Sequence, residues 1–394
     1  MKVSDLMAQN ISCDDGRDLS GLPTYKLTEQ IDLVAYQDTG LYTVLPLGMR
    51  VLNKIKNLIH EINRKAGIAE VNFPALQRKI LWETSGRWKT FEKQIIEIAS
   101  GYSSFIATPT NEEYVCNLLR TRLQSHKQLP LKFYQIGDIF KGNTPSKGVL
   151  RSLVFEVYEA YSLDSDEASL KWTRTTFEDI FDAIFSALEL DIIKVDYPSG
   201  DFVNYLFSHL DGEHKILSEN GRFRLWNRND RCQASKAISI GMYKIYDRDF
   251  SKMFKLNYTD SSNVRRNPIM STYGIGISRL LFAMVDSNRD SSGIKWKEGF
   301  EPFEYAIVTR QRQNQIEESQ AKKMYKYLHE NAISVLLDNR YDKDLALKLK
   351  SLRAIGIPKI ILVNEHNLTN ITLIENKSSS IQSINSIISE YIRR

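Results

Sequence analysis

Residues 134–163 carry the side chains whose chemistry is easiest to interpret. They predict an apolar strand ending at Phe140, a loop rich in Gly, Asn, Pro, Ser and Lys, and a second strand that begins near Arg151. Phe155 follows that arginine by four positions, and Lys141 stands at the other end of the loop. An aromatic ring can stack on a base and cations bind phosphates. The segment therefore predicts a nucleotide-binding hairpin, with Phe155 against the base and Arg151 and Lys141 facing phosphates.

A second anion-binding pattern lies at residues 270–286. A predicted strand runs into Gly274 and Gly276, and a predicted helix opens at Ile277–Arg279. The glycines let the backbone come close to a ligand. An arginine in a helix's first turn is poorly placed for the helix dipole, unless an anion lies in front of it. We therefore expect Arg279 to bind phosphate, although a tight strand-to-helix turn would explain the same glycines without a ligand.

Residues 106–113 open a helix and place Thr110 and Glu112 close together. One interpretation is a capped helix start, with Thr110 or Asn111 as the cap and acidic residues in the first turn. The other is a site for a substrate ammonium group, because a carboxylate and a hydroxyl suit a cationic amine. Arg151 and Phe155 also have simpler explanations, since an arginine that begins a strand is commonly solvated and a strand phenylalanine is commonly core.

Amphipathic helices and strands surround these segments. Apolar residues spaced three and four apart predict a helix over 48–66 that ends at Gly67, and another helix over 165–190. Residues 68–76 read as a strand that Pro74 interrupts. Beyond about residue 300, strands and helices alternate, which predicts a small α/β domain. Its predicted strands are 305–309, 333–338 and 360–363, and its predicted helices are 316–330, 343–354 and 381–392.

The composition is typical of a globular protein with two or three domains, 42% hydrophobic and 26% charged over 394 residues. A net charge of +5 favours a polyanionic partner only weakly. Three widely spaced cysteines argue against disulfides, and the histidines lack ligand spacing, so we expect no structural metal. No long apolar run predicts a membrane span, and the first residues lack the apolar core of a secretion signal, so we expect a cytoplasmic protein.

Several long, collinear stretches of this sequence resemble the prolyl type of class II aminoacyl-tRNA synthetase. They include the 134–163 hairpin, which resembles the second signature motif of the class, and Tyr273–Arg279, which resembles the third. Five further stretches are similar to the prolyl family: residues 40–52, 81–88, 128–136, 335–340 and 355–358. The resemblance implies an antiparallel class II catalytic sheet with helices over residues 40–300. It also implies a small α/β domain like the anticodon-binding domain over 301–394, an N-terminal arm over 1–39, and a homodimer.

The same resemblance assigns roles to individual residues. Thr110 and Glu112 match the family's Thr-x-Glu loop, which holds the amino group of the amino acid, and Thr272 occupies a position that lines the amino-acid site. Arg151 and Arg279 would hold the phosphates of ATP with Mg²⁺, and Phe155 would stack on the adenine. Lys141 would neutralise charge at the reacting phosphate, and Asn143 would accept a hydrogen bond from the adenine amino group. The partners implied are an amino acid, ATP and tRNA.

The sequence departs from the family at these same places. The family's second motif has Phe-Arg-x-Glu, where this chain has Phe140-Lys141-Gly142-Asn143. The stretch 241–248 lacks the His, Gln and Thr of the family's Gly-His-Ile-Phe-Gln-Leu-Gly-Thr, and Thr272 replaces a cysteine. Too few residues separate Phe155 from Gly274 for the editing insertion of many bacterial relatives. Three functions are consistent with this pattern. They are a synthetase that charges tRNA, a paralogue that activates another amino acid for another acceptor, and a non-catalytic tRNA-binding or regulatory protein.

Overall fold

The structure is a computed structural model, and it describes residues 1–6, 18–100, 103–142, 151–219, 222–226, 230, 233–363, 370–375, 378–383 and 389. The chain forms two compact units. The central unit comprises Thr39–Leu41 and Lys56–Ala283, and the terminal unit comprises Met1–Asp38, Tyr42–Ile55 and Met284–Arg394. The domain boundaries expected at residues 39 and 300 stay predictions.

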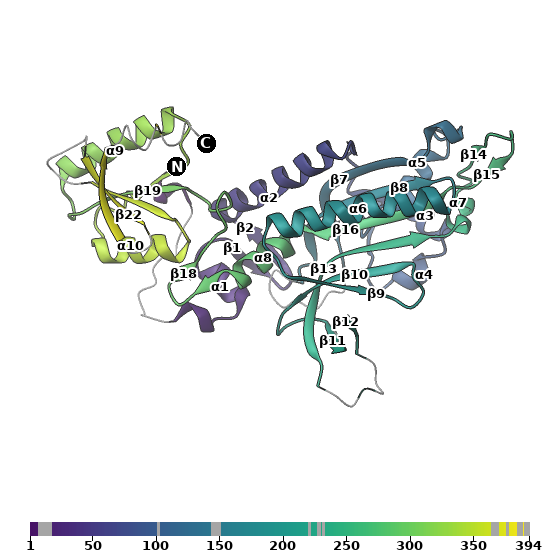
Figure 1. The fold of residues 1–394 in the computed structure, drawn as a ribbon, viewed down its shortest axis with the longest axis horizontal. Coiled ribbons are helices and arrows are strands. Elements are labelled where there is room, and N and C mark those ends of the chain that lie inside the picture. Colours follow the sequence, from purple (N-terminus) through teal and green to yellow (C-terminus); the bar gives the residue numbers. More distant parts are fainter. Residues whose placement is uncertain are drawn as a thin grey trace. The chain divides into compact units, whose positions relative to one another are not determined.

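A nine-stranded sheet forms the body of the central unit (Figure 1). Its main path runs β12–β11–β13–β16–β8–β7–β3, and β10 pairs with both β13 and β9. The strands pair antiparallel, except that β3 is parallel to β7. The strands are β3 Ala69–Glu70, β7 Leu131–Phe140, β8 Val154–Asp164, β9 Ile192–Asp196, β10 Phe202–Ser208, β11 His214–Glu219, β12 Arg222–Leu225, β13 Ser235–Tyr246 and β16 Ile269–Gly276. The predicted hairpin is therefore β7 and β8.

Helix α6, Glu167–Ala187, covers one face of this sheet (Figure 1). Its Phe177 ring stacks on Tyr273 of β16, with ring centroids 4.1 Å apart. The helix confirms the amphipathic pattern predicted over 165–190. Because successive strand residues point to opposite faces, Thr272 and Gly274 lie on the other face of β16 from Tyr273.

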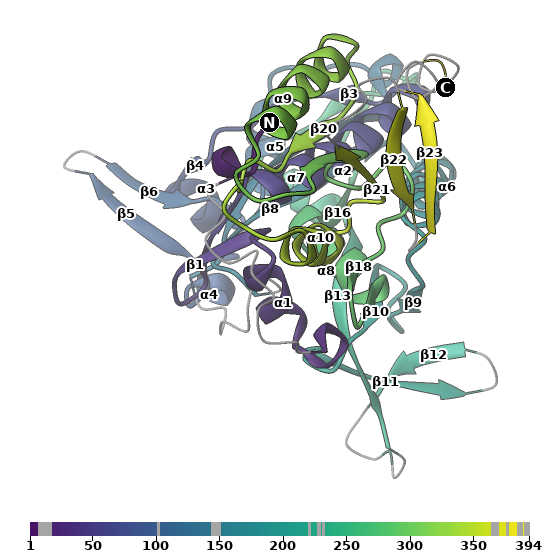
Figure 2. The same ribbon diagram turned by 90° about the vertical axis from the view of Figure 1, so that its left-hand side faces the viewer.

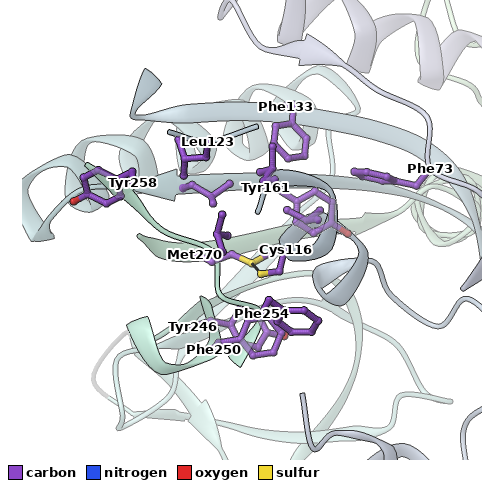
Figure 3. Packing of buried hydrophobic residues seen from close by; sticks show 14 residues of the cluster. Phe73, Cys116, Leu123, Phe133, Tyr161, Tyr246, Phe250, Phe254, Tyr258 and Met270 are labelled. Atoms are coloured by element: carbon purple, nitrogen blue, oxygen red, sulfur yellow. Dashed lines mark hydrogen bonds between the residues drawn. The ribbon is translucent and has the colours of Figure 1, made fainter. Parts of the chain in front are cut away.

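The opposite face packs against α5, Glu112–Leu119, and α7, Arg248–Met253. Figure 3 shows this core from close by, with Cys116 of α5 against Met270 of β16 and with Tyr246, Phe250 and Phe254 grouped together. The two sulfur atoms, Cys116 Sγ and Met270 Sδ, are 3.5 Å apart. This packing anchors the first turn of α5, and with it Glu112, on the sheet.

Smaller elements complete the central unit. A three-stranded sheet of order β4–β6–β5 stands beside α3 and α4. The elements are β4 Leu76–Arg78, α3 Lys79–Thr84, α4 Trp88–Phe91, β5 Ile96–Ser100, β6 Ser103–Ala107, η3 His126–Gln128, β14 Tyr258–Thr259 and β15 Arg265–Arg266. The β5–β6 hairpin and the β11–β12 hairpin each project away from the body of the central unit (Figure 2). The single strand predicted over 68–76 is wrong, because the chain leaves β3 after Glu70, and Pro74, which cannot donate to a ladder, lies before β4.

The terminal unit contains a five-stranded sheet of order β20–β19–β21–β22–β23 with α9 and α10. Its elements are β19 Tyr305–Thr309, α9 Gln315–Glu330, β20 Val335–Leu337, α10 Leu345–Ala354, β21 Lys359–Val363, β22 Asn370–Glu375 and β23 Ser378–Ser383. The predicted α/β alternation is confirmed as far as β21. The helix predicted over 381–392 is wrong at its start. Ile381 of β23 pairs with Thr372 of β22. The three serines before Ile381 are poor helix formers, and the strand ladder satisfies the backbone hydrogen bonds of this segment instead.

The remaining elements lie between residues 3 and 65 and between residues 277 and 294. They are η1 Val3–Leu6, η2 Leu19–Gly21, α1 Thr24–Gln30, β1 Val34–Asp38, β2 Leu41–Val44, α2 Pro46–Lys65, α8 Ile277–Ser287, β17 Arg289–Asp290 and β18 Gly293–Ile294. Helix α2 confirms the helix predicted over 48–66. No helix in the described part of the chain is long and apolar enough to cross a membrane.

Candidate active site

The sheet face that packs against α5 carries two of the predicted site residues, Phe155 and Thr272, and we call it the site face. The other described ones lie in helices or loops. Ladder pairing aligns the strands here: Glu159 of β8 lies opposite Gln135 of β7 and Gly274 of β16. Phe155 lies four residues before Glu159 on the same strand and so points to the same side. Phe155 and Glu159 therefore lie on the same face of the sheet, at two different positions along β8.

Phe155 stands at one end of this face, beside two cations. The Lys141 Nζ lies 5.5 Å from the centre of its ring, and the Arg279 guanidinium carbon lies 5.8 Å from it. Burial, followed by the Arg279 charge, lowers the pKa of Lys141. The predicted grouping of these three residues is found in the structure. Asn143 lies outside the described residues.

Arg151 and Arg279 come together on one carboxylate, Glu213, just before β11. Glu213 accepts from Arg151 Nη2 at 3.2 Å and from Arg279 Nη1 at 3.4 Å. Arg279 also donates to the backbone oxygen of Ser239, and the Ser239 amide donates to Glu213 at 3.3 Å. Burial alone would raise the pKa of Glu213, but the arginine charges, Arg279 above all, hold that pKa below its usual range. Two phosphate-binding candidates from distant segments thus share one anion.

Glu112, Glu113 and Arg87 form a second, buried cluster at the first turn of α5. Arg87 Nη1 lies 3.2 Å from a Glu112 oxygen and 3.0 Å from a Glu113 oxygen. Thr110 donates to Glu112 at 2.5 Å, and the Tyr246 hydroxyl donates to its other oxygen at 3.1 Å. The predicted Thr110–Glu112 pair is therefore in contact, and Asn111 is the helix N-cap residue, although its side chain does not cap.

The ionisation of this cluster follows from its charges. Burial raises the pKa of both carboxyls, and Arg87 opposes this. The balance leaves the pKa of Glu112 lowered, whereas burial raises the pKa of Glu113 to about 7. Glu112 is therefore the anion of the pair, with hydrogen bonds from a hydroxyl and a phenol. A carboxylate held in this way can bind an ammonium group.

A buried amide network positions the start of α5. Glu159 accepts from Asn111 at 2.8 Å and from Gln135 at 2.9 Å. Gln77 donates to the Asn111 side chain at 3.0 Å and accepts from the Trp82 indole at 2.8 Å. Burial raises the pKa of Glu159 to about 7. These bonds tie β4, α3, α5, β7 and β8 together around Glu112.

Thr272, the third residue predicted for the amino-acid site, is buried in β16. It lies opposite Tyr161 of β8 and opposite Lys244 of β13. Sequence reasoning missed Arg87, Glu213, Glu159 and Lys244. Arg87 lies in the family-like stretch 81–88, which could have indicated it, whereas the other three are placed by strand register or by a loop. Among the described residues, no group of three or more His, Cys, Asp or Glu side chains could hold a metal ion.

Comparison with known proteins gives one family for this arrangement. Residues 95–288 match the tRNA synthetase class II core domain (G, H, P, S and T). The proline–tRNA ligase of Ehrlichia chaffeensis is 27% identical over 404 residues, covering 93% of this chain and 92% of the relative. That of Anaplasma phagocytophilum is 28% identical, covering 86% and 87%.

Solved structures show the same fold. Giardia lamblia prolyl-tRNA synthetase in complex with prolyl-adenylate has a TM-score of 0.75 at 19% identity, covering 92% of this chain and 75% of that one. The Cryptosporidium parvum prolyl-tRNA synthetase complexed with halofuginone and AMPPNP also scores 0.75, at 15% identity, covering 94% and 74%. The catalytic fold predicted from the sequence is confirmed.

Proposed function

We propose that this chain, which belongs to the class II aminoacyl-tRNA synthetases, is a prolyl-tRNA synthetase-like ligase that activates an amino acid with ATP and transfers it to tRNA. The observation that carries the proposal is a single sheet face with a cationic end and an anionic end. Arg151, Arg279 and Phe155 gather at the first end, and Glu112 lies at the second. ATP carries a polyphosphate that suits the cationic end, and the amino acid carries an ammonium group that suits the anionic end.

At the cationic end, Arg151 and Arg279 would hold the β- and γ-phosphates, and Phe155 would stack on the adenine. Guanidinium groups suit this role because they bind phosphate oxygens through paired N–H groups. Lys141 would face the α-phosphate, where negative charge develops. Catalysis then comes from positioning and electrostatic stabilisation, with no protein nucleophile.

At the anionic end, Glu112 and Thr110 would bind the α-amino group, which turns the carboxylate of the amino acid toward the phosphates. A carboxylate oxygen attacks the α-phosphorus and the bond to the β-phosphate oxygen breaks, giving aminoacyl adenylate and pyrophosphate. A ribose hydroxyl of tRNA then attacks the carbonyl carbon and releases AMP. Arg87 acts indirectly here, because it fixes the ionised Glu112.

The described residues are compatible with Mg²⁺ as a partner of ATP rather than as a resident ion. Mg²⁺ commonly binds one or two carboxylates together with substrate phosphates. Glu213 is the carboxylate that contacts both phosphate-binding arginines, so it would provide such a ligand. When bound, the ion would neutralise phosphate charge.

We also carry the finer expectations from the family to this chain. The five-stranded sheet of the terminal unit, with α9 and α10, would bind the tRNA as an anticodon-binding-like domain. Two chains would form a homodimer, and the protein would be cytoplasmic. A second function has a specific observation in its favour. The lysine at position 141 and the altered residues of β13 suit a paralogue that activates an amino acid other than proline, for tRNA or for another acceptor.

Calorimetry with AMPPNP and charging of total tRNA test the proposal. Wild type is expected to bind AMPPNP and to form aminoacyl-tRNA, and Arg279→Met is expected to weaken nucleotide binding about 100-fold. Arg174→Met is the matched control, because Arg174 lies on the opposite face and pairs with Glu178 at 3.1 Å. Nucleotide binding without tRNA charging would favour another acceptor, and absence of binding would contradict the proposal.

A further inference from the structure

A row of polar side chains crosses the site face on three strands. Thr272 of β16 pairs with Lys244 of β13 on one side and with Tyr161 of β8 on the other. Directly paired residues of antiparallel strands point to the same face, so an ammonium, a hydroxyl and a phenol lie side by side. We call these three residues the Lys244 row. The Tyr161 side chain is fully buried, and its hydroxyl makes no hydrogen bond of regular geometry within the described structure. Burial, followed by the nearby Glu159 carboxyl, raises the pKa of this phenol.

Lys244 itself lies next to the amino-group site. Its Nζ is 4.9 Å from the centre of the Tyr246 ring, whose hydroxyl donates to Glu112. The side chain is half-buried. Within the described part of the chain, no carboxylate lies within ion-pair distance of its Nζ. A half-buried ammonium against a ring, with no anion, is suited to bind one.

The neighbouring row leaves space for a ligand. Gly274 pairs with Met242 on one side and with Glu159 on the other. A Cβ built on Gly274 would meet no heavy atom closer than 3.9 Å, and that atom is the Tyr158 carbonyl oxygen. Because Gly274 has no side chain, a gap remains between the side chains of Met242 and Glu159, beside the Lys244 row.

Charge balance leaves Lys244 available when an amino acid binds. Arg87 and the substrate's ammonium group provide two positive charges opposite Glu112, the anion of its pair, and Glu113, whose pKa is raised by burial to about 7. The raised pKa of Glu159 makes that carboxyl a weak competitor, and its oxygen already accepts from two amides. A further anion near Lys244 would therefore complete the balance.

The position of the row decides which part of the substrate it faces. Phe155 and Tyr161 are six residues apart on β8, which is roughly 20 Å at about 3.3 Å per residue. The reacting carboxylate must point to the phosphate end, where Phe155 lies. The Lys244 row is at the other end of the face, so it faces the side chain of the amino acid.

We propose that Lys244 is a specificity-determining residue and that the amino acid activated here carries a carboxylate side chain. This inference rests on the proposed function, which fixes the direction of the substrate. Thr272 and Tyr161 would donate hydrogen bonds to the same carboxylate. The ring of proline offers only CH₂ groups to the row, which would give the half-buried Lys244 ammonium and the buried Tyr161 hydroxyl no partner.

The test is ATP–pyrophosphate exchange with L-glutamate, L-aspartate, L-glutamine, L-asparagine and L-proline. We expect an acidic amino acid to support more exchange than its amide and more than proline. In Lys244→Met, kcat/KM for the acidic substrate should fall about 100-fold, mainly through a higher KM, while Lys244→Arg stays within about 10-fold of wild type. Lys132→Met is the matched control, because Lys132 lies on the opposite face over Trp172, 4.0 Å from its ring centre.

Two results would overturn the inference while leaving the proposed function intact. One is a preference of wild type for proline or an amide, and the other is an equal loss with all substrates in Lys244→Met. If no amino acid supports exchange, the proposed function fails, and calorimetry with L-glutamate and L-aspartate in the presence of AMPPNP decides. Binding that Lys244→Met abolishes supports the inference, and absent or unchanged binding overturns it.

Discussion

The two ends of the site face are built as opposites. At the end proposed to bind the nucleotide, two arginines share one carboxylate, Glu213. At the end proposed to bind the amino acid, two carboxyl groups share one arginine, Arg87. The first end thus carries a surplus of positive charge, whereas at the second end Arg87 offsets the ionised Glu112 and burial raises the pKa of Glu113 to about 7. At both ends, two like groups are held together by a single counter-ion. The comparison indicates that the geometry of each end depends on its counter-ion, Glu213 or Arg87, which need not touch the substrate.

Removing Arg87 should have the largest effect, because the amino-acid end is the more deeply buried of the two. Arg87→Met leaves two buried carboxyls without a cation, which we expect to cost about 3–5 kcal/mol of unfolding free energy. Urea unfolding measures this. Arg174→Met, which breaks a partly exposed pair with Glu178, should cost under about 1 kcal/mol. Equal losses in the two variants would mean that Arg87 is not a special counter-ion.

The nucleotide end should respond through its metal dependence rather than its stability. Glu213→Gln removes the carboxylate that would bind Mg²⁺ and that aligns both arginines. We expect the Mg²⁺ concentration for half-maximal exchange to rise about 10-fold. Asp211→Asn, in the same loop, is the control. An unchanged Mg²⁺ requirement would show that Glu213 only spaces the arginines.

Between the two ends, Glu159 should make stability depend on pH. Its pKa in the folded protein is raised to about 7, from an ordinary value near 4.5. A raised carboxyl pKa means that the folded state binds the proton more tightly, so the contribution of Glu159 to stability is greatest below about pH 4.5 and is lost as pH rises through about 7. Thermal unfolding of Glu159→Gln should show a smaller fall over this range, with the remainder due to Glu113. An identical pH profile would rule out this role for Glu159.

The smallest effect is expected at Lys141. Its pKa is lowered by burial and by Arg279, so the side chain loses its charge as pH rises through the lowered value. An arginine stays charged in this range. Exchange by wild type should therefore decline at alkaline pH earlier than exchange by Lys141→Arg. Parallel profiles would indicate that Lys141 carries no catalytic charge.

The sequence predicts the parts that depend on local pattern. The α2 and α6 helices follow from apolar spacing, and the β7–β8 hairpin follows from the loop between Phe140 and Arg151. Thr110 with Glu112, and Phe155 with Arg279, follow from motifs that resemble a family. Their contacts in the structure agree with those patterns.

Other features depend on contacts that no local pattern contains. Lys244 is a site residue only because β13 pairs with β16 in one register, and a shift by one position would turn it toward α6. Glu213 lies in a polar loop just before β11, and no local sequence pattern pairs it with Arg151 and Arg279. Arg87 reaches α5 from another segment of the chain. The start of the helix predicted over 381–392 is wrong, because residues 381–383 pair with β22 and pairing partners override propensity.

The most direct test of the central claim is ATP–pyrophosphate exchange by wild type with each of the twenty amino acids, with and without total tRNA. The account predicts exchange that depends on one amino acid or a closely related pair, and that Arg279→Met reduces strongly. Exchange with no amino acid under any condition would contradict the claim that this sheet face forms aminoacyl adenylates.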